Sequence, residues 1–185
     1  MKRLALGNSI LLPYLLIPAV ALLRLTVNHP YNFIPVFSCL LFFGACRPAR
    51  EYALPLFTLV GLDIFLTTHQ YGFALTSGHA VTWLWYLGAM FLGGAMLRNS
   101  FSTWRVLGTS VSASMLFFVA SNFMVWAEWD MYPKTWSGLV ACYVAAIPFF
   151  RNSIVSETAC GLLLLAAVSA GERLLQAKRM QGACS

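Results

Sequence analysis

Asp63 is the residue of this sequence whose chemistry stands out most, because it lies near the middle of the apolar stretch LPLFTLVGLDIFLTTHQ, residues 54–70. An ionisable group at membrane depth is costly unless it faces protein or water, so it marks a functional site by default. We therefore expect Asp63 to serve a ligand or an ion pair. The alternative is a neutral Asp63 that is hydrogen-bonded to a neighbouring helix.

Other polar and aromatic residues gather near one set of ends of the apolar segments, and all three histidines are among them. Asn122 and Trp126 are four residues apart, which places both on one face of a helix. Together these residues predict a polar and aromatic cup for a small ligand. Its candidate members are His29, Asn32, His69, Tyr71, His79, Trp83, Tyr86, Asn122 and Trp126.

Each member also has a simpler interpretation. The Trp and Tyr residues are typical of the aromatic belt at a membrane surface. Asn122 is equally compatible with a hydrogen bond between helices, and the histidines with helix ends in water. Arg151, in the motif PFFRN, is either part of an ordinary turn or, if it falls inside the bundle, the expected ion-pair partner of Asp63.

Several other chemistries have no sequence signal. The five cysteines form no C-x-x-C pair, and the chain has no P-loop, H-E-x-x-H or G-x-S-x-G motif. We expect no metal site of the protein's own, no cofactor and no nucleotide hydrolysis. The net charge of +6 is spread over separate segments and forms no patch, so a nucleic-acid partner is not expected.

The elements that must position these residues are membrane helices. Hydrophobic residues make up 59% of the 185 residues and charged residues only 10%, against roughly 25% charged in a soluble domain. Runs such as CLLFFGA are apolar on every side, which favours helices over barrel strands. We predict an all-α, polytopic bundle, one domain over 1–185, with apolar segments at 9–27, 32–45, 52–68, 80–97, 105–127 and 136–175.

Lys and Arg set the predicted orientation. They cluster at 2–3, 47–50, 98–105 and 173–179, which we assign to the cytoplasm, and 28–31, 69–79 and 128–135 to the outside. Both termini are then cytoplasmic and six helices cross a bacterial inner membrane, provided that 136–175 makes one crossing with a break at IPFFRN, where Pro148 removes a backbone donor. Seven crossings, and a cleaved signal peptide at the N-terminus, are the alternatives.

Three blocks carry a resemblance to a known family: HPYNFIPVFSCLLFFGA, YALPLFTLVGLDIFL and SNFMVWAEWDMYPKTWSGLVACYVAAIPFFRN. They resemble an uncharacterised bacterial membrane family that is similar to the substrate-binding S components of energy-coupling-factor (ECF) vitamin transporters. The resemblance covers roughly residues 28–165. It implies a six-helix bundle that binds a vitamin-like ligand from outside and works with a membrane coupling protein and two ATPases.

Solitary cobalamin transporters are the nearest S components in this resemblance. They place an outer His, a mid-helix Asp and a late Arg in an order that His29, Asp63 and Arg151 match. Residues 69–90 hold no cysteine to bind cobalt, so His79 is the replacement ligand. If the ligand is a corrinoid, the resemblance therefore implies that His79 or His29 binds its cobalt.

Three functions follow as hypotheses. The first is a substrate-binding transport subunit, not an enzyme, that takes up a vitamin-like small molecule and contacts membrane lipid. The second is an intramembrane enzyme that uses Asp63 and the nearby histidines for acid and base chemistry. The third is a structural or assembly protein of the membrane without a ligand.

Overall fold

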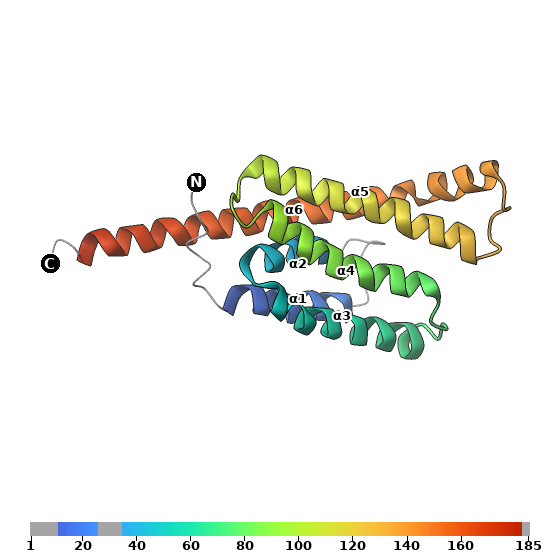
Figure 1. Ribbon diagram of the computed structural model, residues 1–185, viewed down its shortest axis with the longest axis horizontal. Helices are drawn as coiled ribbons and strands as arrows, with labels where there is room; N and C mark the ends of the chain where they lie inside the picture. The colour runs from blue at the N-terminus through green and yellow to red at the C-terminus, as the bar shows by residue number, and fades with distance from the viewer. Residues whose placement is uncertain (1–10, 26–34, 183–185) are drawn as a thin grey trace.

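The computed structural model describes residues 11–25 and 35–182, and within these ranges all regular secondary structure is helical. A 3-10 turn at Ala49–Glu51 precedes α3, and a π-helical turn at Leu66–Gln70 extends it. The prediction of an all-α fold is confirmed. Figure 1 shows the six α-helices, which are α1 Leu11–Leu25, α2 Val36–Cys46, α3 Ala53–Phe65, α4 Ser77–Met96, α5 Thr103–Glu128 and α6 Trp136–Gly182.

One helix differs from its prediction. α6 runs without interruption over 47 residues, with Pro148 inside it, so the break predicted at IPFFRN is wrong. Proline removes one backbone donor from a helix, and here the helical turns on both sides continue past that single missing bond. Pro148 is exposed, and α5 packs beside α6. In Figure 1 the C-terminal part of α6 extends beyond the other helices.

Three stretches are long and apolar enough to cross a membrane, namely Ala49–Gln70, Thr103–Glu128 and Trp136–Gly171. They identify the chain as a membrane protein. α1 and α2 are apolar but shorter, with 15 and 11 residues. At 1.5 Å per residue α2 is about 17 Å long, against about 30 Å of hydrocarbon. Six crossings therefore stay a prediction.

α2 is the centre of the bundle. Residues 36–45 are all buried, and α1, α4, α5 and α6 all pack against it. A helix that is apolar on every side is buried in this way. At Gly44 an added Cβ would lie 1.8 Å from the Met90 carbonyl oxygen, and at Gly93 it would lie 2.0 Å from that of Leu41. Only glycine permits so close an approach of α2 and α4.

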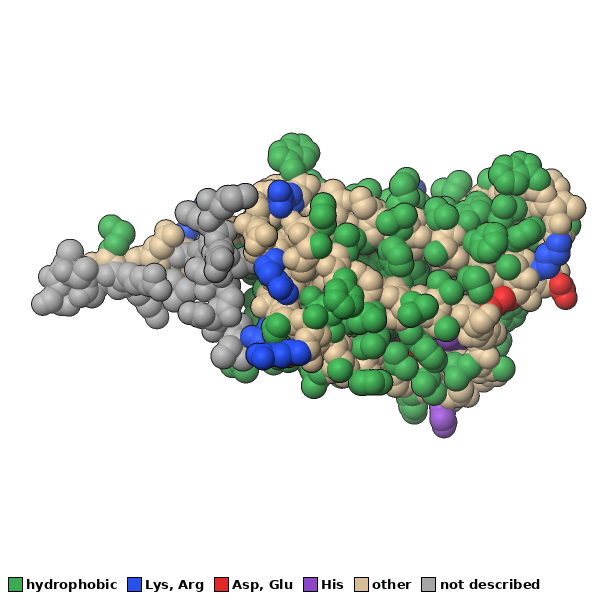
Figure 2. Space-filling model, in the orientation of Figure 1, with side chains coloured by type: hydrophobic (Ala, Val, Ile, Leu, Met, Phe, Trp, Pro, Cys, Tyr) green, Lys and Arg blue, Asp and Glu red, His purple; other side chains and the backbone are tan. Residues whose placement is uncertain are grey.

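The two ends of the bundle carry opposite charge. Figure 2 shows Lys and Arg gathered towards the left-hand end, and Asp and Glu at the right-hand end, where Lys134 pairs with Asp130. At the basic end, Arg98 donates to the backbone carbonyl of Arg47 at 2.7 Å, and Arg47 pairs with Glu51 at 2.5 Å. Glu128 and Asp130 lie in and after the last turn of α5, at the acidic end. In the described residues, the predicted basic segments 47–50 and 98–105 thus lie at one end of the bundle and segment 128–135 at the other, whereas segments 2–3 and 28–31 lie outside the described residues.

Candidate functional site

Asp63 lies inside the bundle in an ion pair with Arg24. It is 5% exposed, and its Oδ1 lies 2.5 Å from Nη2 of Arg24. The indole of Trp83 donates to its other oxygen at 3.2 Å, and Arg24 donates to the Tyr86 hydroxyl at 3.0 Å. Helices α1, α3 and α4 therefore meet in one polar cluster around the carboxylate.

The partner of Asp63 is thus Arg24, and the pairing with Arg151, expected if Arg151 lay inside the bundle, is wrong. Arg151 is exposed on α6, whereas Arg24 stands in the last turn of α1, where it reaches Asp63. A carboxylate in an apolar segment predicts that a partner exists. Which cation supplies it depends on how the helices pack.

Glu157 is a second buried carboxylate, and it was not among the residues predicted from the sequence. It lies on α6, is 2% exposed, and accepts hydrogen bonds from the backbone N–H of Phe37 at 2.9 Å and of Ser38 at 2.6 Å. These are free donors of the first turn of α2. The positive end of the helix dipole lies at the same place. The carboxylate of Glu157 therefore holds the N-terminus of α2 inside the bundle.

A cavity of about 200 Å³ lies between these two polar groups. We call it the inner cavity. Arg24 and Glu157 both line it, and its aromatic walls are Phe37, Tyr86 and Phe117. A wall that contains both charged groups and aromatic rings can hold a small molecule that is both polar and apolar.

Two further cavities adjoin the inner one. The side cavity, about 260 Å³, shares Phe37, Phe117 and Ser153 with it, and the end cavity, about 270 Å³, shares Thr82. The side and end cavities in turn share Ser121 and Val125 on α5. The three cavities therefore lie next to one another between the acidic end of the bundle and the buried charges.

Each outer cavity has a polar atom without a partner. The Ser114 hydroxyl, in the wall of the side cavity, is buried and makes no hydrogen bond to the described residues. The same holds for Oε1 of Glu128 in the end cavity, although its Oε2 accepts the backbone N–H of Gly78 at 3.1 Å. Buried polar atoms are nearly always satisfied. These two groups are available to a ligand or to water.

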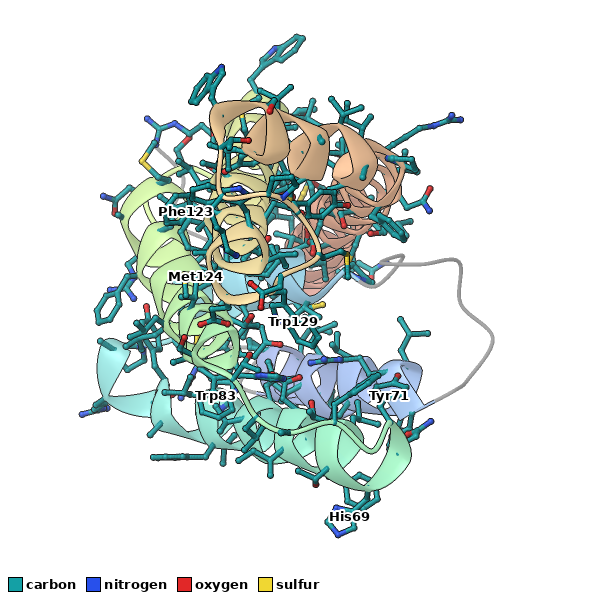
Figure 3. All side chains as sticks on the ribbon, turned by 90° about the vertical axis from the view of Figure 1, so that its right-hand side faces the viewer. His69, Tyr71, Trp83, Phe123, Met124 and Trp129 are labelled. Carbon is teal, nitrogen blue, oxygen red and sulfur yellow. The ribbon has the colours of Figure 1, made fainter. Side chains whose placement is uncertain are left out.

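Two of the predicted histidines are placed by the structure. His79 lines the end cavity, but its Nδ1 accepts the backbone N–H of Thr76 at 3.1 Å and its Nε2 lies 3.2 Å from the Thr67 hydroxyl. Both ring nitrogens of His79 are thus engaged. His69 is exposed, stacks on Phe65 and points away from the helices in Figure 3.

The remaining predicted residues divide between the site and its surroundings. Asn122 lines the side cavity, and its amide donates to the Phe118 carbonyl of its own helix at 2.8 Å. Trp126 donates to the Pro133 carbonyl at 2.9 Å, so it holds the connection from α5 to α6. Tyr71 is exposed. His29 and Asn32 lie outside the described residues.

The structure therefore brings together Asp63, Trp83 and Tyr86 around Arg24, with His79 and Asn122 in the adjoining cavities. Figure 3 looks onto the acidic end, where Trp83 lies between α3 and α4. The described residues include no group of three or more His, Cys, Asp or Glu side chains placed to hold a metal ion. The arrangement fits binding of an organic molecule.

Comparisons with known proteins give one match. No curated protein and no solved structure matches the chain. A family model described as a family of unknown function, DUF6580, matches residues 5–178. That match covers nearly the whole chain, which therefore belongs to the DUF6580 family.

Proposed function

We propose that the protein is a substrate-binding membrane subunit for uptake of a small, vitamin-like molecule, similar in role to the S components of ECF transporters. The supporting observation is the series of adjoining cavities that leads from the acidic end to Arg24 and Glu157. Buried charges at membrane depth are kept where they serve a ligand or an ion path. The protein binds and hands on its ligand, and it performs no chemistry on it.

The proposed orientation follows from charge. Basic loops stay in the cytoplasm, so the end with Arg47 and Arg98 faces inward and the end cavity opens outward. In this arrangement six helices cross the membrane and both termini are cytoplasmic. The chain has no P-loop, so we propose that energy for release comes from a partner such as an ECF coupling protein with its ATPases.

A ligand smaller than a corrinoid is favoured. Each cavity measures 200–270 Å³, below the roughly 300–1,000 Å³ that is common for drug-sized ligands. His79 has no ring nitrogen left for cobalt in this arrangement. The enzyme hypothesis is less favoured, since the oxygens of Asp63 already bind Arg24 and Trp83.

A blocked cavity tests the proposal. Thr82 lines both the inner and the end cavity, so the larger side chain in Thr82→Phe should fill space in both of them. Leu84→Phe is the matched control, because Leu84 is 69% exposed on the same helix. Native mass spectrometry of the purified proteins should find one small molecule bound to the wild type and to Leu84→Phe, and none bound to Thr82→Phe. The same occupancy in all three would contradict the proposal.

A further inference from the structure

We propose that the ligand of the inner cavity is an organic cation with an ammonium group, and that Glu157 is its counter-ion. This inference rests on the proposed function and names the class of ligand. It comes from the balance of charge around the cavity, from the unused acceptor positions of Glu157 and from the aromatic rings in the cavity wall.

With Glu157 ionised, the charge balance around the inner cavity is negative. Among the described residues that line the inner cavity, Arg24 is the cation, and it is already paired with Asp63. No ion pair joins Glu157 to a cation in the described part of the chain. The dipole of α2 compensates only about half a charge. A buried charge needs a partner, so the cavity favours a cation and disfavours an anion.

The geometry at Glu157 fits an ionised carboxylate with room for a further donor. Oε1 accepts the N–H of Phe37 and Oε2 that of Ser38, so each oxygen already faces a donor. An ionised carboxylate offers about four acceptor positions. Two of them are therefore left for the N–H groups of an ammonium ion, whereas a carboxylate ligand would meet a like charge.

The rest of the wall suits the same ligand. The ring centroids of Phe37 and Phe117 lie 4.8 Å apart, and both rings line the inner cavity together with Tyr86. The faces of aromatic rings attract cations, most strongly where water is excluded. The carboxylate and the rings together form a site for a positively charged nitrogen attached to an apolar body.

The test compares three probes of nearly equal shape on the purified full-length protein at neutral pH. They are the 2-phenylethylammonium ion, neutral 2-phenylethanol and the 3-phenylpropanoate anion. Binding is measured as a shift in Tm, followed by tryptophan fluorescence over a range of probe concentrations. The ammonium probe should bind at least about tenfold more tightly than the other two.

Two variants locate the binding. Glu157→Gln should remove the preference for the ammonium probe. Phe117→Leu, which keeps Glu157, should weaken binding of the ammonium probe about 3- to 30-fold. This variant provides the test if Glu157→Gln fails to fold. Phe91→Leu is the control, because Phe91 is 53% exposed on α4, and it should bind like the wild type.

The outcomes separate this inference from the proposed function. Equal binding of the neutral and ammonium probes, tighter binding of the anion, or no binding of any probe would each overturn the assignment of a cation. The proposed function would still stand if a co-purified small molecule were lost from Thr82→Phe but kept by Leu84→Phe. A preference for the ammonium probe that survives in Glu157→Gln would also overturn the role of Glu157.

Discussion

Ser38 and Glu157 are joined by two hydrogen bonds, although they lie on different helices. The backbone N–H of Ser38 donates to Oε2 of Glu157 at 2.6 Å, and the Ser38 hydroxyl donates to the Glu157 backbone carbonyl, also at 2.6 Å. Since α2 has no N-cap hydrogen bond from its own chain neighbour Pro35, α6 supplies the cap. The central helix is thus fixed by the residue that we propose as the counter-ion of the ligand.

This arrangement predicts a large difference between two adjacent positions. Glu157→Ala should lower the free energy of unfolding by about 2–4 kcal/mol, because two buried backbone N–H groups lose their acceptor. Thr158→Val should be neutral or slightly stabilising, because the buried Thr158 hydroxyl has no hydrogen-bond partner in the described part of the chain. Thermal unfolding in detergent measures both. Equal Tm values for the two variants would show that the cap contributes nothing.

The ion pair of Arg24 and Asp63 predicts a non-additive cycle. Asp63→Leu should cost about 3–5 kcal/mol, because it leaves Arg24 largely buried without its partner, and adding Arg24→Leu should restore part of the loss. Arg151→Leu should have little effect, since Arg151 is exposed. Unfolding free energies of the single and double variants measure the coupling. Additive losses, or coupling of Asp63 to Arg151 instead, would contradict the observed pairing.

The packing of α2 against α4 predicts opposite effects for two glycines. Gly44→Ala should destabilise the protein by about 1–3 kcal/mol, because the new Cβ would meet the backbone of Met90. Gly88→Ala on α4 meets nothing within 4 Å and should be neutral, or stabilising by up to about 1 kcal/mol through helix propensity. Thermal unfolding again provides the measurement. A stable Gly44→Ala protein would mean that the helices lie further apart.

The neighbouring thiols of Cys39 and Cys160 predict a specific crosslink between α2 and α6. Their sulfur atoms lie 3.9 Å apart, whereas Cys142 lies near the backbone of Asn122. In a protein whose only cysteines are Cys39 and Cys160, mild oxidation should form a disulfide. The disulfide should protect both thiols from maleimide labelling after mild denaturation. A protein with only Cys39 and Cys142 should keep both thiols reactive after the same oxidation and mild denaturation. Equal protection in both would contradict the packing of these helices.

The sequence predicted the helices well because their signal is local. Every backbone polar group of a membrane segment must be satisfied within the segment, so an apolar run such as residues 105–127 already identifies α5. The predicted break at Pro148 was wrong because one missing donor does not outweigh the backbone hydrogen bonds of the helical turns around it. Local sequence patterns therefore predict where a helix forms better than they predict where it breaks.

The site was only partly predictable. Asp63 stood out as an acidic residue in an apolar segment, and its burial is confirmed. Glu157 in SIVSETACGLLLL carries the same signal and was open to the same argument. The choice of Arg24 over Arg151, and the meeting of Glu157 with the start of α2, depend on packing between distant helices. No spacing along the chain contains that information.

The most direct test of the central claim, that the cavities hold a small molecule, is an experimental density map of the protein purified from its own membrane. We predict non-protein density in the inner cavity, in contact with Glu157 and the ring of Phe117, at a resolution that shows side chains. A map in which that space is filled by protein side chains, or contains only ordered water, would contradict the account.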